Sequence, residues 1–223
     1  MRMLAVFTKG ERLRHIGHLD LMRAMQRALR RSGLPVSYSK GYNPHILLTF
    51  ASALSTGAWG RREIMDVTLE EAISPDSFVK AMNDALPADL QVLSARAIDD
   101  RHPALMAMVA AAEYTLTILD DETAAALNAC REDFLLQQTI VTPRKTKSGV
   151  ADCDIKPLIL ELASAGNQIR AKLCLTERTS CKPDMLLTAW CSFAGRPVPR
   201  CLICRESLWG MDAAGSLQPL ETL

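Results

Sequence analysis

Apolar residues near the N-terminus recur first at strand spacing and then at helix spacing. Positions 3–10, MLAVFTKG, alternate loosely between apolar and polar side chains and predict a strand. Positions 17–35 carry apolar residues from Met22 to Leu29 at the three- and four-residue spacing of a helix. Glycine is favoured just after a helix, so we expect this helix to end before Gly33.

The pattern continues through residue 98 with one further helix and three extended segments. An extended stretch interrupted by a turn is expected at 36–51, a strand at 62–72, a helix at 74–87 and a strand at 90–98. The resulting order β-α-β-β-α-β is that of the ferredoxin-like plan.

The same order is repeated more weakly after residue 110. The pattern predicts strands at 113–120, 139–147 and 199–210, a hairpin at 158–176, and helices at 123–137 and 182–195. The hairpin turn is expected at Ser164-Ala165-Gly166-Asn167. We therefore predict an α+β protein of tandem ferredoxin-like halves with antiparallel sheets, in domains 1–100 and 101–223, with extra structure around 152–157.

Charge is distributed unevenly, although the formal net charge of the 223 residues is only +1. Residues 1–45 hold nine basic and two acidic side chains, residues 46–140 six and fifteen, and residues 141–223 eleven and eight. A basic N-terminal section can present a polyanion-binding face even on a nearly neutral protein. Charges scattered over solvated surfaces are the alternative.

Three arginines of the first predicted helix share one face. Arg23, Arg27 and Arg30 are spaced i, i+4 and i+7, opposite the apolar stripe, and Arg31 lies alongside. Like charges four residues apart oppose helix formation, and a phosphate backbone would relieve that repulsion. An ordinary solvated helix face is the other reading.

The stretch YSKGYNPH, residues 38–45, follows this helix and offers little to a hydrophobic core. Gly41 permits close approach of a ligand to the backbone, and Asn43 before a proline favours a turn. Tyr42 offers a flat surface on which a nucleic-acid base can stack. The alternative is a tight loop whose tyrosine rings pack on the helix.

The residues that we propose to contact nucleic acid come from the basic N-terminal section and from a second basic segment at 142–149. A solvated hairpin would explain the second segment equally well. The proposed contact residues are Lys9, Arg12, Arg14, His18, Arg23, Arg27, Lys40, Tyr42, Asn43, His45, Arg144 and Lys145. His15, His18 and His45 are also candidates for a general acid or base in RNA cleavage.

Few features support an autonomous enzyme. The chain has no phosphate-binding glycine loop and no metalloprotease or serine-hydrolase motif. Cys201 and Cys204 form a single CxxC without a second tight pair, so neither a metal site nor a cofactor is expected. Seven cysteines, no signal-peptide pattern and no apolar run of membrane-spanning length favour a cytoplasmic protein.

The stretch from Ile16 to His45 resembles the radical SAM-linked family, uncharacterised bacterial proteins encoded beside or fused to radical S-adenosylmethionine (SAM) proteins. The resembling features are His18-Leu19-Asp20, the arginine-rich helix and Ser39-Lys40-Gly41-Tyr42-Asn43-Pro44, followed by residues 54–67, 103–107 and 154–159. The segment after Pro44 and the glycine at position 17 depart from the family pattern. The resemblance implies a radical SAM protein as partner and a role in RNA modification or maturation.

We therefore expect a non-enzymatic RNA-binding accessory module that works with a radical SAM enzyme on an RNA such as tRNA or rRNA. A protein–protein adaptor that docks the radical SAM partner and a metal-independent endoribonuclease are the alternatives. The oligomeric state does not follow from the sequence.

Overall fold

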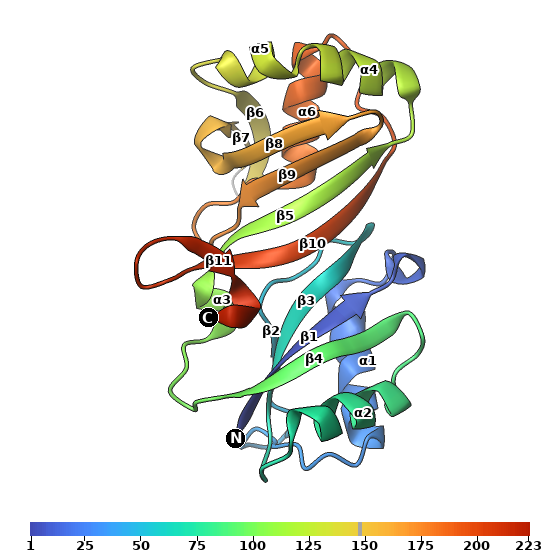
Figure 1. Ribbon diagram of the computed structural model, residues 1–223, viewed down its shortest axis with the longest axis vertical. Coiled ribbons are helices and arrows are strands. Elements are labelled where there is room, and N and C mark those ends of the chain that lie inside the picture. The colour runs from blue at the N-terminus through green and yellow to red at the C-terminus, as the bar shows by residue number, and fades with distance from the viewer. Residues whose placement is uncertain (147–148) are drawn as a thin grey trace. The chain divides into compact units, whose positions relative to one another are not determined.

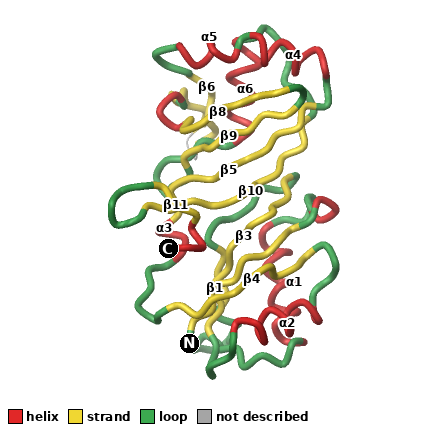
Figure 2. The backbone as a smooth tube through the Cα atoms, in the orientation of Figure 1, coloured by secondary structure: helices red, strands yellow, loops and turns green. Residues whose placement is uncertain are grey.

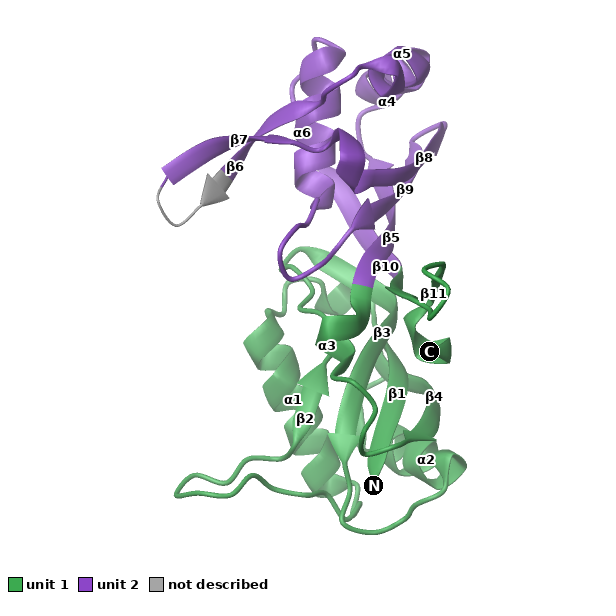
Figure 3. Ribbon diagram, turned by 90° about the vertical axis from the view of Figure 1, so that its left-hand side faces the viewer, with its two compact units in different colours: residues 1–109, 207–223 green, residues 110–206 purple. Residues whose placement is uncertain are grey.

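The chain folds into two compact units of mixed α and β structure. The structure, a computed structural model, describes residues 1–146 and 149–223 (Figure 1). Unit 1 comprises residues 1–109 and 207–223, and unit 2 comprises residues 110–206 (Figure 3). The strand pairs are mostly antiparallel, and helices and strands are interspersed along the chain (Figure 2).

Helices and strands account for most of the described residues. The α-helices are α1 (His18–Arg31), α2 (Pro75–Ala85), α3 (Leu105–Met108), α4 (Asp121–Ala129), α5 (Arg131–Leu136) and α6 (Pro183–Phe193). The strands are β1 (Arg2–Lys9), β2 (Leu48–Phe50), β3 (Ala58–Thr68), β4 (Leu90–Ile98), β5 (Val109–Ile118), β6 (Val141–Thr146), β7 (Gly149–Asp154), β8 (Ile159–Ala165), β9 (Gln168–Cys174), β10 (Cys201–Met211) and β11 (Leu217–Pro219). Short 3-10 helices lie at η1 (Glu11–Leu13), η2 (Lys156–Leu158) and η3 (Leu220–Thr222). Among the described helices, none has both the length and the apolar content to cross a membrane.

In unit 1 the elements from β1 to β4 follow the predicted order β-α-β-β-α-β. Strand β1 lies between β4 and β3 and is antiparallel to both, while β2 pairs with the C-terminal part of β3. The strand order is therefore β4-β1-β3-β2, and β10 also pairs with β3.

Both faces of the unit 1 sheet are covered. Alternate residues of β1, among them Met3 and Phe7, join a core cluster with side chains of α1 and α2. Leu4, which points to the opposite face, is buried as well. On that second face Arg62 pairs with Glu221, and Arg96 donates a 2.9 Å hydrogen bond to the Glu221 carbonyl. The C-terminal segment thus lies over the sheet face opposite α1 and α2.

Unit 2 contains the order β10-β5-β9-β8 together with a separate two-stranded ribbon, β6–β7. Its helices pack through aromatic side chains: Phe134 of α5 stacks on Trp190 of α6 with ring centroids 5.4 Å apart. Figure 3 shows the β6–β7 ribbon extending from the body of unit 2. The ribbon occupies the position in the chain where the extra structure around 152–157 was expected.

Three observations refine the predicted elements. The helix expected at 123–137 is divided into α4 and α5 at Cys130, and the segment expected as a strand at 139–147 pairs with β7 in the ribbon. The hairpin at 158–176 is confirmed, with Gly166 and Asn167 as its two-residue turn. The compact units differ from the predicted domains 1–100 and 101–223, because residues 207–223 belong to unit 1.

Candidate nucleic-acid interface

The outer face of α1 carries a stripe of exposed arginines. Leu21, Met25 and Leu29 bury the inner face, so helical geometry places Arg23, Arg27 and Arg30 on the solvent side, and all three are exposed. Gly17 caps the helix without a side-chain hydrogen bond. We call Arg23, Arg27 and Arg30 the α1 arginine stripe.

Only one member of the stripe has an acidic partner among the described residues. Arg23 lies 3.0 Å from Asp20, one turn earlier on the same helix, and both side chains are largely exposed. Arg27 and Arg30 make no hydrogen bond or ion pair within the described part of the chain. Since an exposed pair at this spacing contributes at most a few tenths of a kcal/mol, Arg23 can leave Asp20 for an anionic ligand at little cost.

The stretch Tyr38–His45 forms a projecting loop, which we call the tip loop. Its base is tied to the sheet: Ser37 N–H donates to the Thr68 carbonyl at 2.9 Å, and Leu47 N–H donates to the Ser37 carbonyl at 2.9 Å. Tyr38 and Ile46 form an isolated bridge, and the Ile46 side chain is fully buried. Figure 3 shows this connection between α1 and β2 reaching out from unit 1.

Ser39 and His45 brace the neck of the tip loop through three contacts. Ser39 N–H donates to the His45 carbonyl at 2.8 Å, and His45 N–H donates to Ser39 Oγ at 3.1 Å. Ser39 Oγ also lies 2.8 Å from Nδ1 of His45. His45 is therefore engaged, through its backbone and Nδ1, in holding the loop together.

The residues at the end of the tip loop are exposed. Lys40, Tyr42 and Asn43 all face solvent, and Gly41 has a φ of 127°, a conformation that other residues rarely adopt. The relative exposure of Tyr42 is 105%, so its ring does not pack on the helix. The alternative interpretation, in which the tyrosine rings of this loop pack on the helix, is therefore wrong for Tyr42.

The segment before α1 contributes cations that are partly engaged. Arg14 contacts Glu11 at 3.2 Å, and Arg12 lies 4.0 Å from Asp89, with both arginines near solvent. His15 is exposed, whereas His18 is half-buried with its ring edge on Phe50, at a centroid distance of 5.5 Å. These side chains lie at the N-terminal end of α1, and the tip loop follows its C-terminal end.

Lys9 cannot contact a phosphate, which corrects the expectation from the sequence. Its side chain is only 1% exposed, and Nζ donates hydrogen bonds to the carbonyls of Ile16 at 2.8 Å and Ala58 at 3.1 Å. Lys9 therefore fixes the segment that leads into α1. In the sequence this lysine stands at the end of a predicted strand, where a lysine is expected to be exposed. Its burial depends on other elements that cover it in the folded protein.

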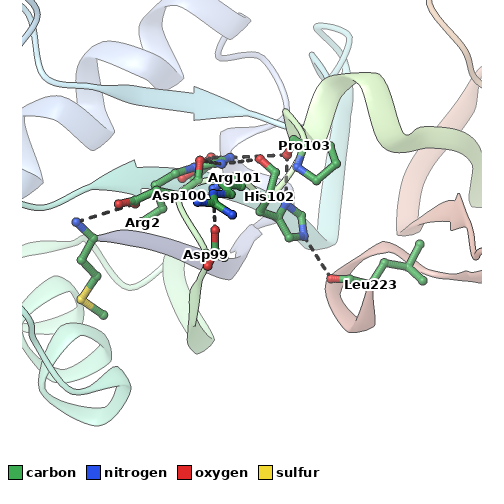
Figure 4. A network of polar contacts seen from close by, with 9 residues as sticks. Arg2, Asp99, Asp100, Arg101, His102, Pro103 and Leu223 are labelled. Atoms are coloured by element: carbon green, nitrogen blue, oxygen red, sulfur yellow. Dashed lines mark hydrogen bonds and ion pairs between the residues drawn. The ribbon is translucent and has the colours of Figure 1, made fainter.

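Arg2 and Arg31 are likewise engaged within unit 1. Arg2 pairs with Asp66 and donates to the backbone carbonyls of Asp100, His102 and Pro103, as part of the network shown in Figure 4. Arg31 donates a 2.7 Å hydrogen bond to the Ala85 carbonyl of α2. Part of the basic charge of residues 1–45 thus stabilises the fold and does not converge on one groove.

Sequence reasoning missed a groove between α1 and α2. Its volume is about 420 Å³, and its lining residues are Arg31, Ser32, Ser77, Lys80, Ala81, Asp84 and Ala85. Lys80 is paired with Asp84 at 2.7 Å, so the groove is only weakly basic. Its two sides are about fifty positions apart in the chain, and no local pattern marks their contact.

Arg144 and Lys145 belong to unit 2. Arg144 is half-buried on the β6–β7 ribbon and lies near the Cys181 thiol. Burial, reinforced by nearby thiols and Asp184, raises the pKa of Cys181 to about 12, while the Arg144 guanidinium opposes that shift. The side chain of Lys145 and the neighbouring residues 147–148 lie outside the described residues.

The described residues hold no cluster of three or more histidine, cysteine or acidic side chains suited to a metal ion. In the CxxC pair, Cys204 is buried, and burial raises the pKa of Cys201 to about 12. Thiols with such pKa values remain protonated near neutral pH and are poor nucleophiles. The arrangement in unit 1 is instead suited to binding an extended anion.

The chain is similar to one known protein family. A family model described as "Uncharacterized protein conserved in bacteria (DUF2344)" matches residues 2–183. No curated protein matches the chain. The matched segment includes the α1 arginine stripe and the tip loop.

Proposed function

We propose, from the premise that this chain belongs to the DUF2344 family of uncharacterised bacterial proteins, that it is a non-enzymatic RNA-binding protein. The observation that carries the proposal is the α1 arginine stripe, three exposed guanidinium groups on one helix face, two of them without an acidic partner in the described residues. Arginine forks match phosphate oxygens in geometry and charge.

The stripe is unfavourable for the isolated protein. Arg23 and Arg27 are four residues apart, and a like-charge pair at this spacing opposes the helix by about 0.2–0.5 kcal/mol. Arg27 and Arg30, three residues apart, are also neighbours on the helix surface. A phosphate backbone relieves this repulsion, because its regularly spaced negative charges can lie along α1. Binding also releases the counterions condensed on the nucleic acid. Acidic side chains of a protein partner can relieve the repulsion as well, so a protein–protein adaptor is the outcome to test against.

The wider setting of the proposal comes from the resemblance to radical SAM-linked proteins. On that ground we propose a radical SAM enzyme as partner and modification or maturation of an RNA such as tRNA or rRNA as the process. The tandem ferredoxin-like plan is part of the same proposal. The strand orders β4-β1-β3-β2 and β10-β5-β9-β8 support it, because both follow the order fourth, first, third, second along their own part of the chain.

RNA affinity at several salt concentrations tests the function. A labelled single-stranded RNA is titrated with the wild type and with the double variant Arg27→Gln plus Arg30→Gln. Each phosphate contact contributes about 0.7 to the slope of log affinity against log salt, so the double variant should reduce that slope by about 1.4. Arg101→Gln, which also removes an exposed cation of unit 1, is the matched control and should leave the slope unchanged.

Three outcomes oppose the proposal. An unchanged slope in the double variant excludes the stripe as the RNA site. RNA cleavage that is lost in His15→Ala, His18→Ala or His45→Ala would show an endoribonuclease instead. Copurification of a protein partner that survives nuclease treatment and is lost in the double variant would favour the adaptor.

A further inference from the structure

We infer that the tip loop is a base-stacking element, so that the RNA bound by unit 1 is single-stranded at the loop and places an unpaired base on Tyr42. This inference rests on the proposed RNA-binding function and specifies its substrate class. Its basis is the combination of a braced loop neck with an aromatic ring that touches nothing in the described structure.

The loop neck is constrained, and this determines what Tyr42 can do. Four polar contacts hold the two sides of the neck together, one between Ser37 and Leu47 and three between Ser39 and His45. The buried Ile46 side chain anchors the returning strand in the core. A ligand that meets the tip therefore encounters a preorganised surface and loses little affinity to ordering of the loop.

Tyr42 differs from the other aromatic residues of the described chain. Phe7, Phe50, Phe78 and Phe134 are buried, and the relative exposure of Tyr42 exceeds that of every other large hydrophobic side chain described. A ring held fully in water gains nothing for folding, because it removes no apolar surface from solvent. The position is therefore explained by contact with a partner molecule.

The neighbours of Tyr42 favour a nucleotide over an apolar protein pocket. Lys40 and Asn43 flank the ring and offer an ammonium and an amide to phosphate or to a base edge, and both are exposed. Gly41, with its φ of 127°, leaves one side of the tip without a side chain. An apolar protein pocket would leave these polar neighbours without partners on binding.

An unpaired base is required because stacked bases inside a duplex offer no free face. Single-stranded RNA can splay a base onto an aromatic ring, whereas double-stranded RNA presents phosphates and 2′-hydroxyl groups. Tyr42 follows Arg30 by twelve residues, which limits their separation to at most about 43 Å, so one RNA strand can extend from the stripe to Tyr42. Glu70, whose N–H donates to the Pro35 carbonyl, is an acidic group close to the loop base.

The test compares variants and RNA chemistries at one salt concentration. Wild type, Tyr42→Phe and Tyr42→Ala are titrated with a single-stranded oligonucleotide, the same oligonucleotide with abasic positions, its duplex, and inorganic polyphosphate. Tyr42→Ala should bind the single strand about tenfold more weakly, and Tyr42→Phe should bind like the wild type. Leu93→Ala, which removes another exposed apolar side chain of unit 1, is the control and should change nothing.

Fluorescence of 2-aminopurine placed in the oligonucleotide reports stacking directly. The wild type should quench it and Tyr42→Ala should not, while the abasic strand and polyphosphate should bind both proteins equally. If the wild type binds RNA but Tyr42→Ala binds every ligand as tightly, the stacking inference is overturned and the RNA-binding function stands. If the wild type binds no RNA, the proposed function itself falls.

Discussion

The guanidinium group of Arg2 contacts the carboxylate of Asp66, with Nη2 and Oδ2 2.5 Å apart and Nε and Oδ2 3.1 Å apart. The side chains are only 15% and 9% exposed, and Oδ1 of Asp66 has no hydrogen-bond partner in the described residues. The same guanidinium binds carbonyl groups of the segment after β4 (Figure 4). Arg2 therefore links strands β1 and β3 to the segment 100–103, which follows β4 in the chain.

Replacing Arg2 with methionine should destabilise the protein strongly. The change leaves the Asp66 carboxylate buried without its cation, which typically lowers the free energy of unfolding by about 3–5 kcal/mol. Urea unfolding followed by circular dichroism measures the effect. Arg12→Met is the matched control: its side chain is 87% exposed and 4.0 Å from Asp89, so a change within about 0.5 kcal/mol is expected.

A variant that removes both partners distinguishes the Arg2–Asp66 ion pair from the other contacts of Arg2. Arg2→Met with Asp66→Leu should recover much of the loss, because no unpaired charge stays buried. Equal losses in the single and double variants would mean that the carbonyl contacts of Arg2, and not its pairing with Asp66, dominate.

The turn of the β8–β9 hairpin gives a second prediction. Gly166 has a φ of 58°, a left-handed conformation in which a β-carbon costs about 1–2 kcal/mol. Gly166→Ala should lower the free energy of unfolding by about 1 kcal/mol. Gly166→Asn is the control, since asparagine tolerates this conformation, and it should cost clearly less in the same urea titration.

Thiols with raised pKa values give a prediction on cysteine reactivity. Burial raises the pKa of Cys181 and of Cys201 to about 12 and that of Cys191 to about 11. In the folded protein these thiols should resist alkylation by iodoacetamide at pH 8, while the half-buried Cys153 is modified first. Mass spectrometry of peptides after timed labelling checks the order of modification.

The same shifts determine how stability changes in alkaline solution. An unfolded thiol ionises near pH 9, whereas the folded thiols stay protonated up to pH 11–12, so the unfolded state releases protons first. Their contribution to stability is complete below pH 9 and is lost as the pH rises toward 12. Cys181→Ala should flatten this decline between pH 9 and 12, and an unchanged decline would contradict the assignment.

Local patterns were sufficient where the elements are stabilised by near neighbours. The periodicity around Met25 and the glycine after the helix predicted α1. The turn predicted at 164–167 located the β8–β9 connection, although Ser164 and Ala165 still belong to the strand. These features depend on helical spacing and turn conformation, which a short sequence window contains. The exposed arginine stripe followed from the same helical spacing.

Non-local contacts account for what the sequence could not reveal. Residues 207–223 belong to unit 1, where Glu221 contacts Arg62, a partner 159 positions away. The break between α4 and α5 at Cys130 is marked by neither a glycine nor a proline in the sequence. The sequence also placed Lys9 on a basic surface, because burial depends on the elements that cover a side chain in the fold.

Lys9 and Lys40 therefore make a direct comparison between a structural and a surface lysine. Lys9 is 1% exposed and donates to the Ile16 and Ala58 carbonyls, whereas Lys40 is exposed at the end of the tip loop. Lys9→Met should lower the free energy of unfolding by about 3 kcal/mol, since it removes two hydrogen bonds from a charged donor worth about 1.5 kcal/mol each. Lys40→Gln should leave it unchanged.

RNA titration of the two variants should give the opposite result, at a temperature where both remain folded. Lys40→Gln should reduce the slope of log affinity against log salt by about 0.7, the share of one phosphate contact, while Lys9→Met should retain the wild-type slope. A reduced slope in Lys9→Met, with its far-ultraviolet circular dichroism unchanged, would mean that the amine reaches the ligand despite its burial. An unchanged slope in Lys40→Gln would remove the tip-loop ammonium from the phosphate contacts, because a solvent-exposed cation has no structural role through which to compensate.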